Sequence, residues 1–332
     1  MPVAARVDPA EVFAPDEWAA LTAKSRWRGL WLVAHCWGAI GLCLVLGGLW
    51  PWLIPLLVPL VAARQLGLLI LMHDAAHGLL HPNRRINDWV GKWLCSSALP
   101  VYRTAHLRHH RFAQQPEDPD LPLSRPFPIE AHSLRRKLLR DVTGASFLKL
   151  RLGIDLEARA RRRAAAHPKT DPDATANAKP ATKASAKATD LLSTGLDPRF
   201  VWGNLGFFVL FALAGYAWLW IALWLLPLAC WFPLVYRLRN IAEHALVPVG
   251  EPDPYRHART TRAAWWERAL LAPYWVNYHS EHHLFTQLPC WNLPRAHALL
   301  AQRGLLPRML VADGYRQVLR EAVRPAVEGA AR

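Results

Sequence analysis

Residues 65–77, QLGLLILMHDAAH, carry an apolar run that ends in two histidines, and this stretch decides the fold. Arg64 alone separates it from an earlier stretch, residues 29–63, that contains no acidic or basic side chain. A helix needs about 20 apolar residues to cross a bilayer. We therefore expect one membrane span at 29–49 and a second at 51–72. For Arg64, which falls inside the second span, we favour snorkelling or an ion pair within the bundle over a substrate-binding role.

A second uncharged stretch runs from Phe200 to Tyr236. It is too long for one span and just long enough for two, at 199–215 and 217–236, with Gly215 at the turn. The sequence therefore predicts an all-α membrane protein with four transmembrane helices in two hairpins.

The distribution of basic residues predicts how these spans are oriented. Neither hairpin turn carries Lys or Arg, whereas basic residues flank the other ends of the spans: Lys24, Arg26, Arg28, Arg84, Arg85, Arg103, Arg108, Arg111, Arg199, Arg237 and Arg239. Positive charge is retained on the cytoplasmic side. We therefore expect both termini and the segment between the hairpins to be cytoplasmic. The formal charge of +15 then suits anionic lipids, and we expect no nucleic-acid partner.

The remaining segments complete the predicted organisation. Residues 1–28 form a cytoplasmic N-terminal segment, 29–310 the membrane domain, and 311–332 a cytoplasmic C-terminal tail. Within the membrane domain, residues 160–190 are rich in Ala, Lys, Thr and Pro. This composition offers little apolar surface to bury, so we expect a flexible insertion.

The histidines fall into three short boxes. HDAAH contains His73 and His77, HLRHH contains His106, His109 and His110, and HSEHH contains His279, His282 and His283. Spacings of three and four place side chains on one helix face. All three boxes lie on the cytoplasmic side of the predicted spans, so we expect them to form a cytoplasmic helical cap with one shared site.

A ninth candidate ligand is His244 in NIAEH, just past the fourth span. Asn240, four residues earlier on the same helix face, could contact a metal-bound water. Three acidic residues inside these motifs could orient the imidazoles as hydrogen-bond acceptors: Asp74, Glu243 and Glu281.

The other histidines are not included in the site. His35 lies in an apolar span and is interpreted as a core residue, and Pro82 after His81 suggests that a helix ends there. The unclustered histidines are expected at the surface: His132, His167, His257 and His297.

The number of clustered histidines predicts two metal ions. Neutral imidazole binds Zn, Cu, Fe and Ni. One zinc site takes four ligands at most, and a catalytic zinc usually takes three with a water. Eight or nine histidines exceed that number, so two metals sharing them fit better.

At these residues the sequence resembles the membrane fatty acid desaturase and hydroxylase superfamily. HDAAH, HLRHH and HSEHH match its three histidine boxes, and the Asn240–His244 pair resembles the additional ligands of acyl-CoA desaturases. The stretches HLRHHRFAQQPEDPDLP and NYHSEHHLFTQLPCWNLP are similar to the second and third boxes of sphingolipid desaturases and carotenoid ketolases. The third box begins with His279, where front-end desaturases carry Gln.

This resemblance implies a diiron oxidoreductase with two Fe2+ ions and O2 as co-substrate. The implied reaction is oxidation of an unactivated C–H bond in a lipid acyl chain drawn from the membrane, as fatty acyl or sphingolipid-type desaturation. A carotenoid ketolase or hydroxylase, or a lipid hydroxylase, would use the same centre. A metal transporter or sensor fits less well, because transporters place their ligands near the middle of the membrane.

The electrons are expected to come from a separate protein. The chain lacks the HPGG signature of a fused cytochrome b5 and has no clustered cysteines for an iron–sulfur centre. A ferredoxin or cytochrome-type donor is therefore implied. The protein is expected in the inner membrane if it is bacterial, with its active site facing the cytoplasm.

Overall fold

The computed structural model describes residues 4–124, 126–149 and 198–324, and these are mostly helical. The insertion expected at 160–190 lies outside the described residues. Two three-residue strands, β1 (Arg259–Thr261) and β2 (Leu310–Ala312), pair in parallel. The α-helices are α1 (Pro15–Thr22), α2 (Arg28–Leu49), α3 (Ile54–His77), α4 (Arg84–Val90), α5 (Leu99–Arg111), α6 (Leu121–Ser124), α7 (Ala131–Val142), α9 (Pro198–Leu213), α10 (Ala217–Trp220), α11 (Phe232–His244), α12 (Trp265–Leu270), α13 (His279–Leu284), α14 (Leu293–Gln302) and α15 (Tyr315–Glu321).

Three helices in the described part of the chain are long and apolar enough to cross a membrane: Arg28–Leu49, Pro51–His77 and Ala217–His244. The last of these joins α10 to α11 through two π-helical turns. The first two predicted spans are therefore confirmed as long apolar helices. The third predicted span corresponds to α9, which is apolar but only 16 residues long. The turn at Gly215 is present, with φ of +80°.

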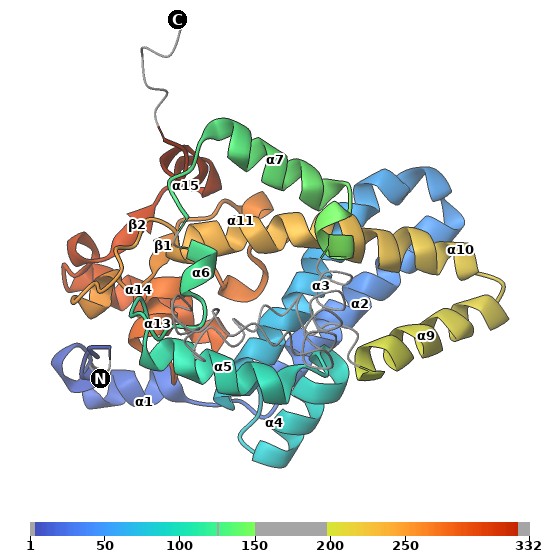
Figure 1. Cartoon of the computed structure of the whole chain (residues 1–332). Coiled ribbons are helices and arrows are strands. Elements are labelled where there is room, and N and C mark those ends of the chain that lie inside the picture. The colour runs from blue at the N-terminus through green and yellow to red at the C-terminus, as the bar shows by residue number, and fades with distance from the viewer. Residues whose placement is uncertain (1–3, 125, 150–197, 325–332) are drawn as a thin grey trace, which may run out of the picture.

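Helix α3 runs through the middle of the molecule, between α2, α5 and α11 (Figure 1). It continues past the predicted end of the second span, so HDAAH forms its last turn. The helix ends there because Gly78 adopts φ of +76°, and its N–H bonds back to Ala75 and Asp74. Arg103 of α5 also donates to the carbonyls of Ala75 and Ala76, at 2.9 and 3.0 Å. The first histidine box is thus held at a capped helix end.

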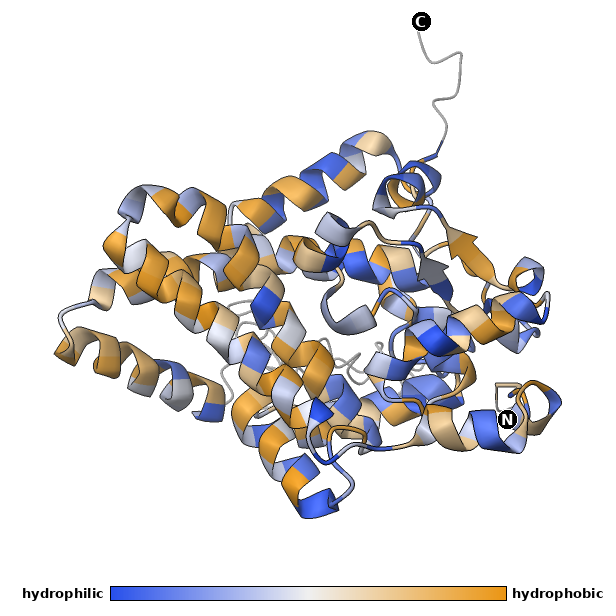
Figure 2. Cartoon of the chain, turned by 180° about the vertical axis from the view of Figure 1, so that it is seen from behind, coloured by the Kyte–Doolittle hydropathy of each residue, from blue (hydrophilic) through white to orange (hydrophobic). Residues whose placement is uncertain are grey.

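The surface divides into an apolar part and a polar part. Figure 2 shows apolar residues concentrated on the long helices and on α9, and polar residues at the other end of the molecule. Large apolar side chains are exposed on the long helices, including Trp31, Leu42 and Trp52 at 67%, 58% and 74%. Exposure of this kind over a broad surface is typical of contact with lipid.

The ends of the described chain are folded against the rest. We expected 1–28 and 311–332 to be separate cytoplasmic segments. Instead Leu21 of α1 is fully buried in the core, and so is Val318 of α15 at 1% exposure. The backbone N–H of Tyr315 also bonds to buried Glu267 at 2.9 Å. The segment up to residue 324 is therefore part of the folded domain, because its apolar face covers α11 and β1.

Candidate metal centre

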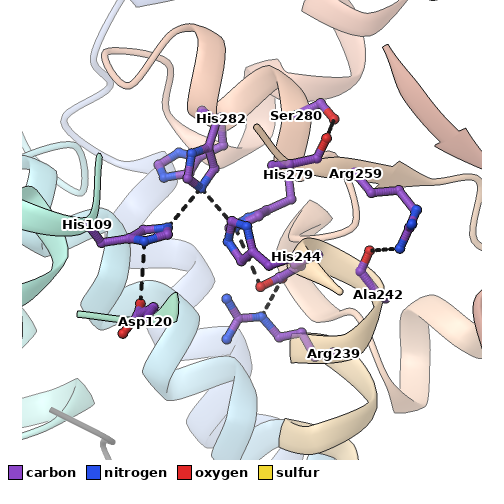
Figure 3. A network of polar contacts seen from close by, with 12 residues as sticks. His109, Asp120, Arg239, Ala242, His244, Arg259, His279, Ser280 and His282 are labelled. Carbon is purple, nitrogen blue, oxygen red and sulfur yellow. Dashed lines mark hydrogen bonds and ion pairs between the residues drawn. The ribbon is translucent and has the colours of Figure 1, made fainter. Parts of the chain in front are cut away.

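All nine histidines proposed from the sequence meet in the interior of the molecule. They come from the C-terminal turns of α3, α5 and α11 and from the short helix α13. The structure divides them into two neighbouring groups. The first group is His73, His77, His106, His110 and His282. Two further sets share His244, one with His109 and His283 and one with His279 and the Glu243 carboxylate; because His279 Nε2 lies 3.2 Å from His283 Nε2, we treat them together as the second group. In Figure 3 His109, His244 and His279 converge from three different elements.

Neighbouring imidazoles approach through their Nε2 atoms. In the first group the Nε2 atom of His106 lies 2.9 Å from that of His77 and 2.9 Å from that of His110. In the second group His279 Nε2 lies 3.0 Å from that of His244 and 3.2 Å from that of His283. Two nitrogens bound at right angles to one metal ion, each about 2.1 Å away, are separated by about 3.0 Å. The spacing therefore fits nitrogens gathered around metal ions.

A buried imidazole nitrogen in the first group lacks a hydrogen-bond partner in the described part of the chain. His73 Nε2 is buried and has no hydrogen-bond partner among the described residues. A buried polar atom without a partner is costly. A metal ion in the first group would satisfy it. The residues present therefore fit the two metal ions that the sequence predicts.

The electrostatics of the boxes favour neutral imidazole. Burial, and then the neighbouring imidazoles, hold the pKa well below its usual value in five box residues: His106, His110, His279, His282 and His283. Neutral imidazole is the form that binds a metal. Burial of the site thus keeps these imidazoles in the form that can bind a metal.

His109 differs because it has a buried carboxylate partner. Its Nδ1 lies 2.7 Å from Asp118 Oδ1. Burial lowers the pKa of His109, but Asp118 outweighs that and raises it to about 9. Backbone N–H groups of Gln114 and Asp120 donate to the same carboxylate at 3.0 and 2.8 Å. A carboxylate at Nδ1 leaves Nε2 free to face a metal.

Asp118 is not among the site residues predicted from the sequence. The available signal was the acidic run EDPD at 117–120, directly after the second box. The turn that follows α5 brings Asp118 back over its own histidine, nine residues earlier.

Two of the three predicted carboxylates contact box histidines. Asp74 Oδ1 lies 3.3 Å from His73 Nδ1, while its other oxygen accepts from the Cys290 N–H. Glu243 Oε2 lies 3.5 Å from His279 Nε2, and its other oxygen accepts from Arg239 at 2.6 Å.

Glu281 has a different position. Its buried carboxylate accepts a hydrogen bond from the Thr260 hydroxyl and lies 2.6 Å from His297 Nδ1. Within the described structure these are its partners, and no box histidine is among them. Its contact with Thr260 attaches α13 to β1, as does the Ser280 hydroxyl, which donates to the Ala258 carbonyl at 2.8 Å. A helix of six residues needs such anchoring, because it is too short to be stable alone.

His244 lies in the second group. Besides its contact with His279, its Nδ1 lies 3.4 Å from the His257 carbonyl oxygen and 3.4 Å from Gln114 Nε2. Asn240 lines the small cavity beside the two groups.

The interpretation of the isolated histidines needs correction. His257, expected at the surface, is only 4% exposed, because its ring bonds to the Glu251 carbonyl and its segment packs under His244. His297 is partly buried through Glu281. His35, expected in the core, is exposed on α2 with its Nδ1 3.1 Å from the Tyr274 hydroxyl.

Three further histidines are not included in the site. His132 is exposed, as predicted, and His81 is buried but accepts from the Asn83 N–H and belongs to neither group. His167 lies outside the described residues.

A cavity of about 50 Å³ adjoins both groups, lined in part by Tyr102, Asp120, Tyr236, Arg239 and Asn240. A water molecule occupies about 30 Å³ in the liquid. The cavity therefore admits water or dioxygen, and an acyl chain would need side chains to move.

Comparisons with known proteins identify the family. A family model described as Fatty acid desaturase matches residues 49–312, which include all three boxes and His244. Dihydrorhizobitoxine desaturase from Bradyrhizobium elkanii is 26% identical over 272 residues, which cover 76% of this chain and 68% of that protein. With most of its length matched and its histidines gathered in two groups, the chain belongs to the fatty acid desaturase family and is an oxidoreductase.

Proposed function

We propose that the protein is a diiron enzyme that uses O2 to oxidise an unactivated C–H bond in a lipid acyl chain, by fatty acyl or sphingolipid-type desaturation. The observation that carries this proposal is the pair of adjacent imidazole groups in a buried site. One zinc ion would leave most of these ligands unused. Two Fe2+ ions, when bound, supply the redox chemistry by which O2 removes hydrogen from carbon.

The chain's own residues prepare the site in four ways. The buried box histidines stay neutral and present Nε2, as their lowered pKa values indicate. Asp118 holds the Nδ1 proton of His109 and fixes the orientation of that ring. Asn240 lines the cavity, where it would position a water. Packing of α3, α5 and α11 around the centre excludes bulk solvent.

The proposed membrane arrangement has four spans in two hairpins, with α9 as the third span and the histidine boxes in a cytoplasmic helical cap. Two long helices support it, because Pro51–His77 and Ala217–His244 both end at the metal centre. Both termini would then be cytoplasmic, in the inner membrane if the protein is bacterial.

The proposed electron donor is a separate ferredoxin or cytochrome-type protein. The chain carries 40 basic and 25 acidic residues, so an acidic donor would be attracted to it. The lipid substrate would enter from the membrane.

A carotenoid ketolase or hydroxylase, or a lipid hydroxylase, is the second candidate, since the same centre serves all of them. The name of the relative favours desaturation, because that protein is called a desaturase. Family membership and the position of the histidines at helix ends both argue against a metal transporter or sensor.

The decisive experiment is lipid mass spectrometry of a host that expresses the chain, a His110→Ala variant or a His132→Ala variant. We expect a lipid lighter by two hydrogens with the wild type and with His132→Ala, and none with His110→Ala. A product heavier by one oxygen would establish the hydroxylase instead, and a product that gains one oxygen and loses two hydrogens would establish the ketolase. Metal analysis should find about two irons per chain. A single tightly bound zinc, in protein never exposed to chelator, would contradict the diiron centre.

A further inference from the structure

A second cavity lies away from the nine histidines of the metal centre, in a groove between α2, α3 and the segment 265–275. It has a volume of about 630 Å³, far larger than the cavity at the metal centre, and its wall is mostly apolar. The two cavities share no lining residue. On α3, Arg64 lines this groove and His73 lines the other cavity. Nine residues at about 100° each place them on opposite faces of the helix.

Two arginines meet in this groove without acidic partners. Arg64 donates to the Ala269 carbonyl at 2.8 Å and lies 5.6 Å from the centre of the Tyr274 ring. Arg268 is exposed at the same groove. Neither forms an ion pair within the described residues. The ion pair favoured for Arg64 from the sequence is thus not found, and its charge faces a groove at membrane depth.

The apolar wall has the length of one lipid leaflet. On α2 the lining of the groove runs from Trp31 to Cys43, which at about 1.5 Å per residue is roughly 18 Å, and Arg64 lies partway along it, because its carbonyl accepts from the Cys36 thiol. One leaflet contributes about 15 Å of the hydrocarbon core. Ala39 and Leu42 lie along this wall, so an acyl chain would contact side chains without polar groups.

Tryptophans mark the polar end of the groove. Trp31 and Trp265 are 67% and 76% exposed and line the groove near its arginines. Exposed tryptophans gather where the hydrocarbon core meets the headgroups. Basic pockets between membrane helices at this depth bind anionic headgroups. The two arginines, the length of the groove and the exposed tryptophans are therefore all consistent with one kind of occupant, an anionic lipid.

We propose that this groove binds an anionic phospholipid, with its phosphate at Arg64 and Arg268 and one acyl chain along α2. The occupant is a bound membrane lipid and not the substrate, because the groove is separated from the metal centre by the width of α3. A lipid here would also hold the segment 265–275, which leads into the third histidine box. The inference rests on the membrane location of the long helices and not on the reaction catalysed.

The test measures lipid binding without turnover. Purified full-length protein in a neutral detergent is mixed with equimolar phosphatidylglycerol and phosphatidylcholine of identical acyl chains, and bound lipid is counted by native mass spectrometry. We expect about one phosphatidylglycerol per chain and little phosphatidylcholine. Arg268→Gln and Arg64→Gln should each weaken phosphatidylglycerol binding about fivefold, since a basic residue contributes about 1 kcal/mol to binding an anionic lipid.

Two further variants separate the site from general charge and from misfolding. Arg316→Gln removes the same charge from an exposed position on α15 and should bind like the wild type. Ala39→Phe blocks the apolar wall, keeps both arginines and should lose the bound lipid. Because Arg268 is exposed, its variant keeps the test valid even if Arg64→Gln fails to fold. Equal retention of the two lipids, equal loss in Arg316→Gln, or displacement by glycerol phosphate alone would overturn the proposal.

Discussion

At His109, one buried carboxylate decides how a ligand is oriented. Asp118 lies 2.7 Å from Nδ1 and is itself held by two backbone N–H groups. We predict that Asp118→Asn lowers iron affinity or activity about 10- to 100-fold, because the charge that fixes the ring is lost. Chelator competition with iron-loaded protein measures the first and product formation the second. Asp16→Asn, at an exposed position on α1, is the control. Equal iron retention in the two variants would exclude a role for Asp118 in metal binding.

His244 is the proposed ligand that the three boxes alone would miss. We predict that His244→Ala loses most activity and part of the iron while the protein still inserts, because its Nε2 lies 3.0 Å from that of His279 in the second group. Asn240→Ala should keep more metal, since its contact would pass through water. Metal analysis and activity check both variants.

The control for this prediction must avoid the neighbouring residues. His257 is unsuitable because it is buried and its carbonyl lies 3.4 Å from His244. His132 is exposed, so His132→Ala should match the wild type. If His244→Ala kept the iron content and activity of the wild type, His244 would be excluded as a ligand and eight histidines would remain.

At the scale of elements, one close approach holds the first box in place. A Cβ added at Gly91 would lie 2.4 Å from the Cβ of Ala75, which stands between His73 and His77 on α3. We predict that Gly91→Ala destabilises the protein by about 1–3 kcal/mol, as overpacking does, and lowers iron content by shifting α3. Thermal unfolding and metal analysis check both effects.

A matched glycine separates packing from helix propensity. A Cβ at Gly38 on α2 would meet nothing within 4 Å. Gly38→Ala should therefore be neutral, or stabilising by about 0.5–1 kcal/mol. If the two variants unfold alike, the contact between Gly91 and α3 does not matter for stability.

The Ala/Lys-rich insertion gives a prediction from composition alone. We predict that deleting residues 165–188 leaves iron binding and some activity, because a polar tether of this kind forms few packed contacts. The deletion is compared with the wild type for iron and product. Complete loss of both in a well-expressed deletion would show that the segment is structural.

At the scale of the whole molecule, the prediction concerns which side of the membrane each turn faces. In a background without native cysteines, His132→Cys should react with a membrane-impermeant thiol reagent only from the cytoplasm. Trp52→Cys and Tyr216→Cys, in the two turns, should react only from outside, because basic residues flank the opposite ends of the helices. Labelling of residue 132 from outside would show that the orientation is the reverse of the predicted one. If one turn reacted from outside and the other from the cytoplasm, the arrangement in two hairpins would be excluded.

The sequence by itself determined the features that depend on neighbouring residues. Apolar length predicted the first two long helices, since crossing a bilayer is a matter of consecutive residues. Spacings of three and four predicted that each box would aim its imidazoles at one point, but the structure divides the second and third boxes between the two groups. His244 was proposed as a ligand because it comes just past the fourth predicted span, four residues after Asn240 on the same helix face.

Only the tertiary structure decided how distant residues combine. His106 and His110 face the first group, while His109, between them on α5, faces the second. That division depends on α3, α11 and α13, which meet α5 only after folding. Folding also decides the burial of Asp118 and of His257. It likewise places Arg64 in the groove of the second cavity, where it has no acidic partner among the described residues. Contacts between residues that lie far apart in the chain follow from helix packing, which no local pattern records.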